Sequence, residues 1–261
     1  MVKGERMDDY LYHFSVGNLA CVAIRDGDDW DRNVLLVNTG QYCVLIDTGT
    51  GDATFPPGIL SERLRAAGTD PTDIDVVILT HADFDHIGGA VDPHGLRTFE
   101  NARYTLLREE WEFWSSKPDR LRPSEAYDES FRQLGNLIPI KRLEQLHDAL
   151  ELIESNVEIV PGIRVVAAPG HTPGYALVTL TSREVQFYFI GDLLYEPTDI
   201  EDPDWYSVFD FDPARVVQTR RHVLDQAANQ HALLMASHLP FPGLGHVTPQ
   251  KTGWHWITLS A

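Results

Sequence analysis

The sequence is poor in basic residues and in long apolar runs. Its 261 residues include 21 Lys and Arg against 39 Asp and Glu, so the formal net charge is −18. Proteins that bind nucleic acid hold its polyanionic backbone with patches of Lys and Arg, whereas this chain has no run of basic residues. No apolar run approaches the about 20 residues that a membrane-spanning helix needs. We therefore expect neither a nucleic-acid partner nor a membrane partner.

Cysteine is also scarce, since the chain contains only Cys21 and Cys43. Both lie in stretches typical of strands and are expected to be buried free thiols, with a disulfide as the alternative. The N-terminal residues lack the basic segment and apolar core of a secretory signal peptide. Together these features predict a cytoplasmic protein.

Length and composition are those of a single globular unit. A chain of 261 residues that is 43% hydrophobic can bury a large core, and no Ser/Gly-rich linker divides it. We predict one domain over residues 1–261. The pattern changes at residues 111–140, where an insertion of short helices is expected. Its aromatic side chains Trp111 and Trp114 are expected to pack in the core, with a substrate pocket as the alternative.

Apolar runs alternate with turn residues along the rest of the chain. They predict two clusters of strands with helices between and after them, which favours two packed sheets with helices outside. Helices are expected at 57–67 and 213–229. Strands are expected at 10–17, 19–25, 33–38, 42–47, 74–80, 103–107, 158–168, 175–180, 185–190, 232–236 and 254–259.

The sequence is rich in potential metal ligands at one point, directly after the apolar residues 74–79. Here His81, Asp83, Asp85 and His86 fall within six residues. In an extended chain, alternate side chains project to the same side, so the first three converge at the end of the strand. Asp85 and His86 then diverge, which suits two neighbouring metals better than one. A polar loop with incidental histidines is the less favoured alternative.

Three more candidate ligands each follow an apolar run: His171, Asp192 and His238. Side chains at strand ends are held by a rigid scaffold and are common in functional sites. A lone histidine carries little information, but candidates at four strand ends form a pattern that predicts a metal centre.

This arrangement resembles that of the metallo-β-lactamase-fold hydrolases, whose signature is HxHxDH followed by a distant His, Asp and His. The resemblance spans roughly residues 35–246 and includes Asp47-Thr48-Gly49, which in the family supports the metal loops. It is nearest to the N-acyl homoserine lactonase-like branch, because of Tyr195 and the stretch 237–246. It implies an α/β fold, the four-layer αββα sandwich.

The resemblance also implies a set of ligands for two divalent ions. One ion takes His81, Asp83 and His171, the other takes Asp85, His86 and His238, and Asp192 bridges them. The chain departs from the family at Asp83, which stands where the family has its second histidine. A carboxylate oxygen can still coordinate, and it shifts the preference toward harder ions. Zinc is the first expectation, with manganese or iron as alternatives.

The function implied by the resemblance is hydrolysis of a lactone or ester, for example an acyl-homoserine lactone, by a hydroxide that bridges the metals. Asp85 and Tyr195 are the expected catalytic residues. The phenol of Tyr195 would hydrogen-bond the substrate carbonyl, and a tyrosine that only packs at a strand end is the alternative.

Other functions stay open at this point. The same scaffold could hydrolyse a phosphotriester or a sulfate ester, and Asp83 could mark a degenerate site in a non-catalytic ligand-binding protein. Phe84, Trp205 and Phe241 are expected to form an apolar mouth over the charged floor. The expected partner is therefore a small molecule, neutral or weakly charged, with an apolar portion. A homodimer is left open.

Overall fold

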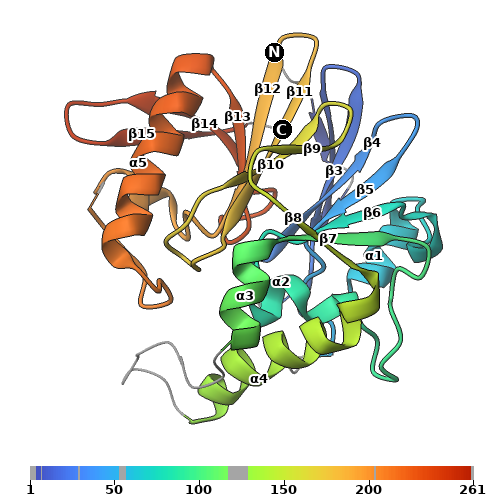
Figure 1. Cartoon of the computed structure of the whole chain (residues 1–261). Coiled ribbons are helices and arrows are strands. Elements are labelled where there is room, and N and C mark those ends of the chain that lie inside the picture. Colours follow the sequence, from blue (N-terminus) through green and yellow to red (C-terminus); the bar gives the residue numbers. More distant parts are fainter. Residues whose placement is uncertain are drawn as a thin grey trace.

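The computed structural model describes residues 4–6, 8–28, 30–52, 57–116, 129–202 and 204–259. Two β-sheets lie face to face within these residues, and helices cover both outer faces (Figure 1). The helices are α1 (Leu60–Ala66), α2 (Phe84–Ile87), α3 (Arg108–Ser116), α4 (Glu129–Leu146) and α5 (Pro213–Gln230), with short 3-10 turns η1 (Pro71–Asp73), η2 (Gly88–Ala90), η3 (His147–Ala149) and η4 (Pro197–Ile200).

The first sheet contains the N-terminal strands in sequence order. Neighbours from β1 to β5 are antiparallel, whereas β5 to β8 run parallel to one another. Its strands are β1 (Gly4–Arg6), β2 (Leu11–Val16), β3 (Leu19–Arg25), β4 (Asn33–Asn38), β5 (Cys43–Ile46), β6 (Val76–Ile78), β7 (Arg103–Leu107) and β8 (Leu150–Ile153).

The second sheet has the order β15-β14-β13-β12-β11-β10-β9. Here β12 and β13 are parallel and the other neighbours are antiparallel. Its strands are β9 (Val157–Val160), β10 (Ile163–Ala167), β11 (Ala176–Ser182), β12 (Val185–Gly191), β13 (Leu233–Ala236), β14 (Leu244–Pro249) and β15 (Trp254–Thr258).

Alternating side chains divide the interior into three apolar layers. On β4, Leu35 and Val37 pack between the sheets, whereas Val34 and Leu36 pack against the helices α1 to α4. On β12, Phe187 and Phe189 pack between the sheets, whereas Tyr188 and Ile190 pack in the layer under α5. Successive side chains of a strand point to opposite faces, so each sheet buries both faces. The result is the predicted four-layer αββα sandwich, which is confirmed.

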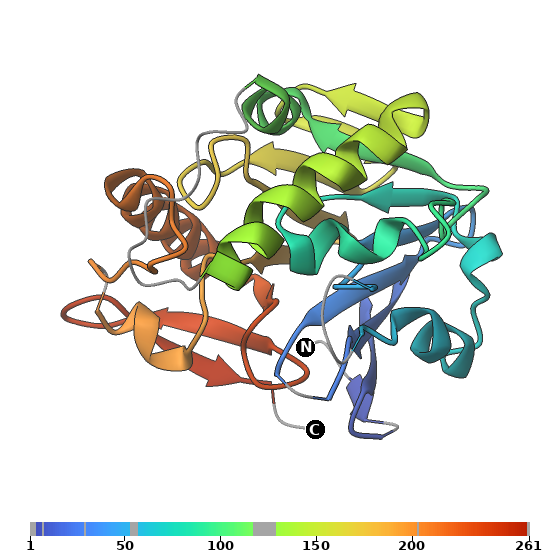
Figure 2. The same cartoon turned by 90° about the horizontal axis from the view of Figure 1, so that it is seen from below.

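Helix α4 supports the segment that carries the metal motif. Seen from below, α4 runs across α2 (Figure 2). The buried guanidinium of Arg142 on α4 donates to the carbonyl oxygen of Gly88 (2.9 Å) and to the carboxylate of Asp52. Helices α3 and α4 lie where short helices are predicted, but α4 is long, with 18 residues and Pro139 inside it. That this segment is an insertion stays a prediction.

Several local expectations need correction or refinement. The predicted strand 158–168 is two strands, because the chain reverses at Gly162, whose φ of +85° suits glycine. Trp114 is buried in the helix-side core, and Trp111 packs against that core, as expected. Both cysteines are free, but Cys43 is only half-buried. None of the helices within the described residues combines the length and apolar character of a membrane span.

Candidate metal centre

The structure brings together the side chains of all seven predicted ligands, each at the end of a strand or just beyond it. His81 and Asp83 follow β6, and α2 begins directly afterwards and carries Asp85 and His86. The remaining three follow strands of the second sheet: His171 after β10, Asp192 after β12 and His238 after β13. The site therefore lies where the two sheets meet at one edge of the sandwich.

The first group of donors consists of His81, Asp83 and His171, which are all buried. Asp83 Oδ2 lies 3.2 Å from His171 Nε2 and 3.6 Å from His81 Nε2. In tetrahedral coordination at about 2.0–2.2 Å, neighbouring ligand atoms lie roughly 3.3–3.6 Å apart. The three donors thus have the spacing of ligands to one ion, and the carboxylate of Asp83 takes the place that the histidine of the signature would fill.

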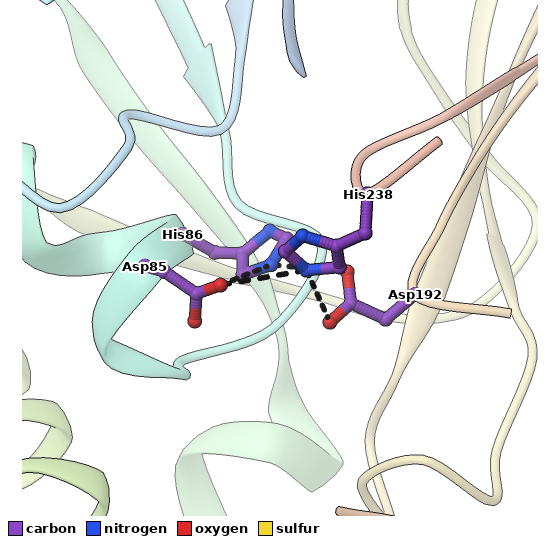
Figure 3. Close-up of side chains that lie close together, drawn as sticks. All are labelled: Asp85, His86, Asp192 and His238. Carbon is purple, nitrogen blue, oxygen red and sulfur yellow. Dashed lines mark hydrogen bonds and ion pairs between the residues drawn. The ribbon is translucent and has the colours of Figure 1, made fainter. Parts of the chain in front are cut away.

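The second group consists of Asp85, His86, Asp192 and His238, whose side chains point toward one another (Figure 3). Asp85 Oδ2 lies 3.6 Å from His86 Nε2 and 3.4 Å from His238 Nε2. These distances again match the spacing of ligands around a single small cation.

Asp192 is shared between the two groups. Its Oδ2 lies 3.2 Å from His238 Nε2 in the second group, and 3.6 Å from His171 Nε2 and 3.9 Å from His81 Nε2 in the first. Its Oδ1 lies 3.0 Å from His86 Nε2. One carboxylate is therefore within ligand distance of all four imidazoles, which is the geometry of a bridging ligand.

Asp47 orients the two imidazoles that come from the metal motif. Asp47 Oδ2 lies 2.8 Å from His86 Nδ1, and Asp47 also accepts from the hydroxyl of Thr80 at 2.9 and 3.0 Å. Thr80 Oγ1 in turn lies 2.9 Å from His81 Nδ1. The predicted supporting role of the segment around Asp47 is therefore seen as direct and relayed hydrogen bonds.

The other two imidazoles are held by groups that the sequence did not indicate. His171 Nδ1 lies 2.9 Å from Asp210 Oδ1, and His238 Nδ1 lies 2.9 Å from the carbonyl oxygen of Asp31. Asp210 is itself fixed by the backbone N–H of Ser207, at 2.7 Å. Carboxylate and carbonyl oxygens only accept, so Nδ1 of each ring carries a proton, and Nε2 is the ring nitrogen that faces the site.

The donor set fits divalent cations. The buried Nε2 of His81 makes no hydrogen bond to any residue that the structure describes, although such an atom is costly to leave unsatisfied. Burial alone would lower the pKa of His86, but the carboxylates of Asp192, Asp85 and Asp47 raise it well above its usual range. The same negative potential stabilises a bound cation. The unsatisfied nitrogen and the charge of three carboxylates both point to metal ions.

A cavity of about 680 Å³ opens onto this centre. Its floor includes Asp83, Asp85, Asp192 and His238, and Trp30, Phe84, Phe209, Pro197 and Pro240 contribute its apolar walls. Of the three aromatic residues predicted at the mouth, only Phe84 is among the described residues that line the cavity. The guanidinium of Arg220 instead lies over the ring of Trp205, with its carbon atom Cζ 5.0 Å from the ring centroid. Phe241 packs against the inter-sheet core.

Two aromatic rings stack on His238, one of the proposed ligands. The ring of Tyr195 lies 5.1 Å from it with an interplanar angle of 3°, and the ring of Trp30 lies 5.2 Å away at 16°. The hydroxyl of Tyr195 donates to Asp192 Oδ2 at 3.2 Å. This hydroxyl is therefore beside the shared carboxylate and at the surface of the cavity.

Comparisons with known proteins agree with this geometry. A model of the metallo-beta-lactamase superfamily matches residues 27–238. An N-acyl homoserine lactonase of Bacillus thuringiensis is 24% identical over 196 residues, which cover 67% of this chain and 68% of the relative. A probable metallo-hydrolase of Mycobacterium tuberculosis is 30% identical over 192 residues, which cover 62% of this chain and 56% of the relative.

Solved structures extend the comparison to nearly the whole chain. The structure of AidC, described as a dizinc quorum-quenching lactonase in complex with a product, matches with a TM-score of 0.89 and 28% identity, covering 97% of this chain and 99% of that one. The residues that match the family model, 27–238, include all seven clustered donors. From the family model and the shared fold, we conclude that the chain belongs to the metallo-beta-lactamase superfamily.

Proposed function

We propose that this protein is a dinuclear metal-dependent hydrolase that acts on a lactone or ester with an apolar portion. An N-acyl homoserine lactone is the first substrate to test, in line with the lactonases among its relatives. The observation that carries the proposal is the position of Asp192, which lies within ligand distance of both donor groups at the floor of a cavity.

In this proposal His81, Asp83 and His171 hold one ion, Asp85, His86 and His238 hold the other, and Asp192 contacts both. Two divalent ions bound together lower the pKa of water toward neutrality and polarise a carbonyl oxygen. Zinc is the proposed native ion. Manganese and iron are the alternatives, because the oxygen of Asp83 replaces an imidazole nitrogen and favours harder ions.

Two cavity residues are proposed to act on the substrate directly. The hydroxyl of Tyr195 is placed to donate a hydrogen bond to the substrate carbonyl, on which negative charge develops. One carboxylate oxygen of Asp85 faces the two imidazoles, and the other points away from them (Figure 3). This second oxygen is proposed to take up the proton that the attacking water gives up and to pass it to the leaving alkoxide, which departs as an alcohol.

The cavity favours a neutral substrate of moderate size. Its volume of about 680 Å³ lies within the range of small-molecule sites. Glu196 adds negative charge to the lining next to apolar walls from Trp30 and Phe209, whereas the carboxylate of Asp31 in the same lining pairs with Arg25 at 3.1 Å. This negative charge would repel an anionic sulfate ester, whereas a lactone with an acyl chain is neutral and would not be repelled.

We also propose a cytoplasmic setting, which the two free thiols support. Burial raises the pKa of Cys21 to about 12 and that of Cys43 to about 11, where Asp75 and Asp73 add to the effect of burial. Both thiols therefore stay protonated at neutral pH, as expected for structural cysteines. The homodimer stays a prediction.

Purified protein is expected to carry close to two divalent ions per chain, because the two donor groups supply a complete set of ligands for two ions. Elemental analysis after extensive dialysis measures this stoichiometry. A chain that takes up none of zinc, manganese and iron would overturn the proposed function and would favour a non-catalytic binding protein. A single ion per chain would show that Asp83 fails to complete its group.

A substrate panel then tests the reaction class. Acyl-homoserine lactones, simple γ-lactones, aryl esters and phosphotriesters are compared by kcat/KM with the metal-loaded protein. We expect the acyl-homoserine lactones to be the fastest, because the apolar walls of the cavity match an acyl chain. Fast cleavage of phosphotriesters without turnover of lactones would replace the lactonase assignment by that of a phosphotriester hydrolase.

Changing Asp83→His restores the histidine of the family signature. We expect the affinity for zinc relative to manganese to rise by on the order of tenfold, since imidazole nitrogen prefers zinc more strongly than carboxylate oxygen does. Competition binding of the two ions measures this ratio. Asp225→His, at an exposed position of α5, is the matched control. If the ratio is unchanged in both variants, Asp83 does not coordinate.

A further inference from the structure

Glu110, in the first turn of α3, is completely buried beside the first donor group. Each of its carboxylate oxygens serves a different segment of the chain. Oε1 accepts from the backbone N–H of Ala82 at 3.0 Å and from the indole N–H of Trp114 at 2.8 Å. Oε2 accepts from the hydroxyl of Thr172 at 2.6 Å and from the backbone N–H of Gly174 at 3.1 Å. The four hydrogen bonds offset the cost of burying the charge.

Two of these four partners are the immediate neighbours of three proposed ligands. Ala82 lies between His81 and Asp83, and Thr172 directly follows His171. The first segment comes from the first sheet and the second from the second sheet. Glu110 therefore connects the two halves of the first donor group, one oxygen to each half.

Two further contacts set the distance between the segment around Ala82 and the segment around Thr172. A backbone hydrogen bond from Ala176 to Thr80, at 2.9 Å, joins them on the strand side. On the ligand side, Gly174 packs so closely on α3 that an added Cβ would lie 2.0 Å from the backbone nitrogen of Glu110. The loop after β10 thus packs directly on the first turn of α3. Glu110, in the same turn, binds the loop after β6 through the backbone N–H of Ala82.

We propose that Glu110 is a positioning residue that sets the spacing between His171 and the pair His81 and Asp83. This inference rests on the proposed function, because it assumes that the three side chains hold a metal ion. Glu110 would thereby control the affinity of the first metal site and leave the second site largely untouched. The other donor group comes from α2 and from the loops after β12 and β13, and none of the described hydrogen bonds that Glu110 accepts comes from these segments.

The variant Glu110→Gln tests this inference, because an amide keeps the shape but has only one acceptor oxygen. One of the two loops then loses its acceptor and meets an NH2 group. We expect the affinity of the first site for zinc to fall about 10- to 100-fold, the usual effect of removing a group that orients ligands. Competition with a chelator on the zinc-loaded protein measures both sites, and His171→Ala identifies the titration step of the first site.

Two further variants separate positioning from general stability. Trp114→Phe removes the one donor that comes from within α3 and should leave both zinc affinities unchanged. Thr172→Val removes one donor of the second loop and should weaken the first site in the same direction as Glu110→Gln, by a smaller factor. Thermal unfolding shows whether each variant is folded, and if Glu110→Gln does not fold, Thr172→Val decides. The visible spectrum of the cobalt-loaded protein should change with Glu110→Gln and Thr172→Val only.

The outcomes distinguish this inference from the proposed function. If the unaltered chain binds two ions and Glu110→Gln and Thr172→Val bind them with the same affinities, the inference fails and the metallohydrolase proposal stands. Equal losses at both sites would likewise overturn it, because they would indicate a general loss of structure. If the unaltered chain binds no metal, both proposals fail.

Discussion

Replacing Asp192 with asparagine is expected to have the largest effect of any single substitution in this chain. We expect kcat/KM to fall at least roughly a thousand-fold, and bound metal to fall below two ions per chain, because both proposed metal sites lose one charged ligand at once. Among the residues that the structure describes, Asp192 is the one whose carboxylate lies within 3.9 Å of Nε2 in His81, His171 and His238 and within 3.0 Å of Nε2 in His86.

Electrostatics supports the same expectation. Burial alone would raise the pKa of Asp192, but His86 and His238 hold it well below its usual range. The side chain is therefore a carboxylate at neutral pH, and the asparagine variant removes a full negative charge from a buried site. Cations bound there would lose part of the charge that stabilises them.

Activity assays and elemental analysis on the same preparation test this prediction. The matched control is Asp225→Asn, which makes the same chemical change at an exposed position of α5 and should leave both quantities unchanged. If Asp192→Asn retained two ions and most of its activity, the shared carboxylate would not be a ligand. The dinuclear proposal would then lose the observation that carries it.

The clustering of the seven proposed ligands could be predicted because their signal is local. The candidates come shortly after apolar runs, as His171 follows β10 and His238 follows β13, and only Asp85 and His86 lie further along, on α2. Strand ends in a sandwich of two sheets gather at its edges, so position along the chain already implied position in space. The fold was predictable for a similar reason, since side chains that alternate along strands such as β4 and β12 leave a clear pattern.

The groups that hold the ligands carry no such signal. Asp210 and Glu110 lie in a loop and in a helix, and nothing in their neighbourhood in the sequence marks them. Their partners are far away along the chain: Asp210 contacts His171, and Glu110 contacts Ala82 and Thr172. Only the tertiary arrangement brings these residues together, so sequence patterns cannot reveal them. The structure therefore adds two buried carboxylates, Asp210 and Glu110, beside the proposed ligands.

Two of the three aromatic residues expected at the cavity mouth and three of the strands were likewise not predicted correctly from the sequence. Sequence position next to a ligand placed Phe84 correctly, but Phe241 turns into the core, while Trp30 reaches the cavity from a distant loop. Strand β14 was missed because it contains glycine and ends in proline, which are poor strand formers. Gly245 is nevertheless suited to it, because an added Cβ would lie 2.4 Å from the ring of Trp256. Strand β1 has the sequence Gly-Glu-Arg, which contains no apolar side chain, and β8, with 4 residues, was also missed.

Replacing Tyr195 with phenylalanine is expected to lower turnover of lactones by roughly ten- to a thousand-fold, the range for loss of a donor to a developing oxyanion. The substitution removes only the hydroxyl. The ring can keep its stacking on His238 at 5.1 Å and on Phe209 at 5.9 Å, so the walls of the cavity should persist. Metal content should stay at that of the unaltered chain, because phenol oxygen is not among the seven donors.

The effect should fall on kcat rather than on KM, because the hydrogen bond strengthens as charge develops on the carbonyl oxygen. Steady-state kinetics with an acyl-homoserine lactone measures both constants. Tyr206→Phe, at a residue that is 55% exposed in the same connecting segment, is the matched control and should change neither. If Tyr195→Phe retains full turnover with its metals in place, Tyr195 serves as a packing residue under His238. Stabilisation of the oxyanion would then have to come from the metal ions alone.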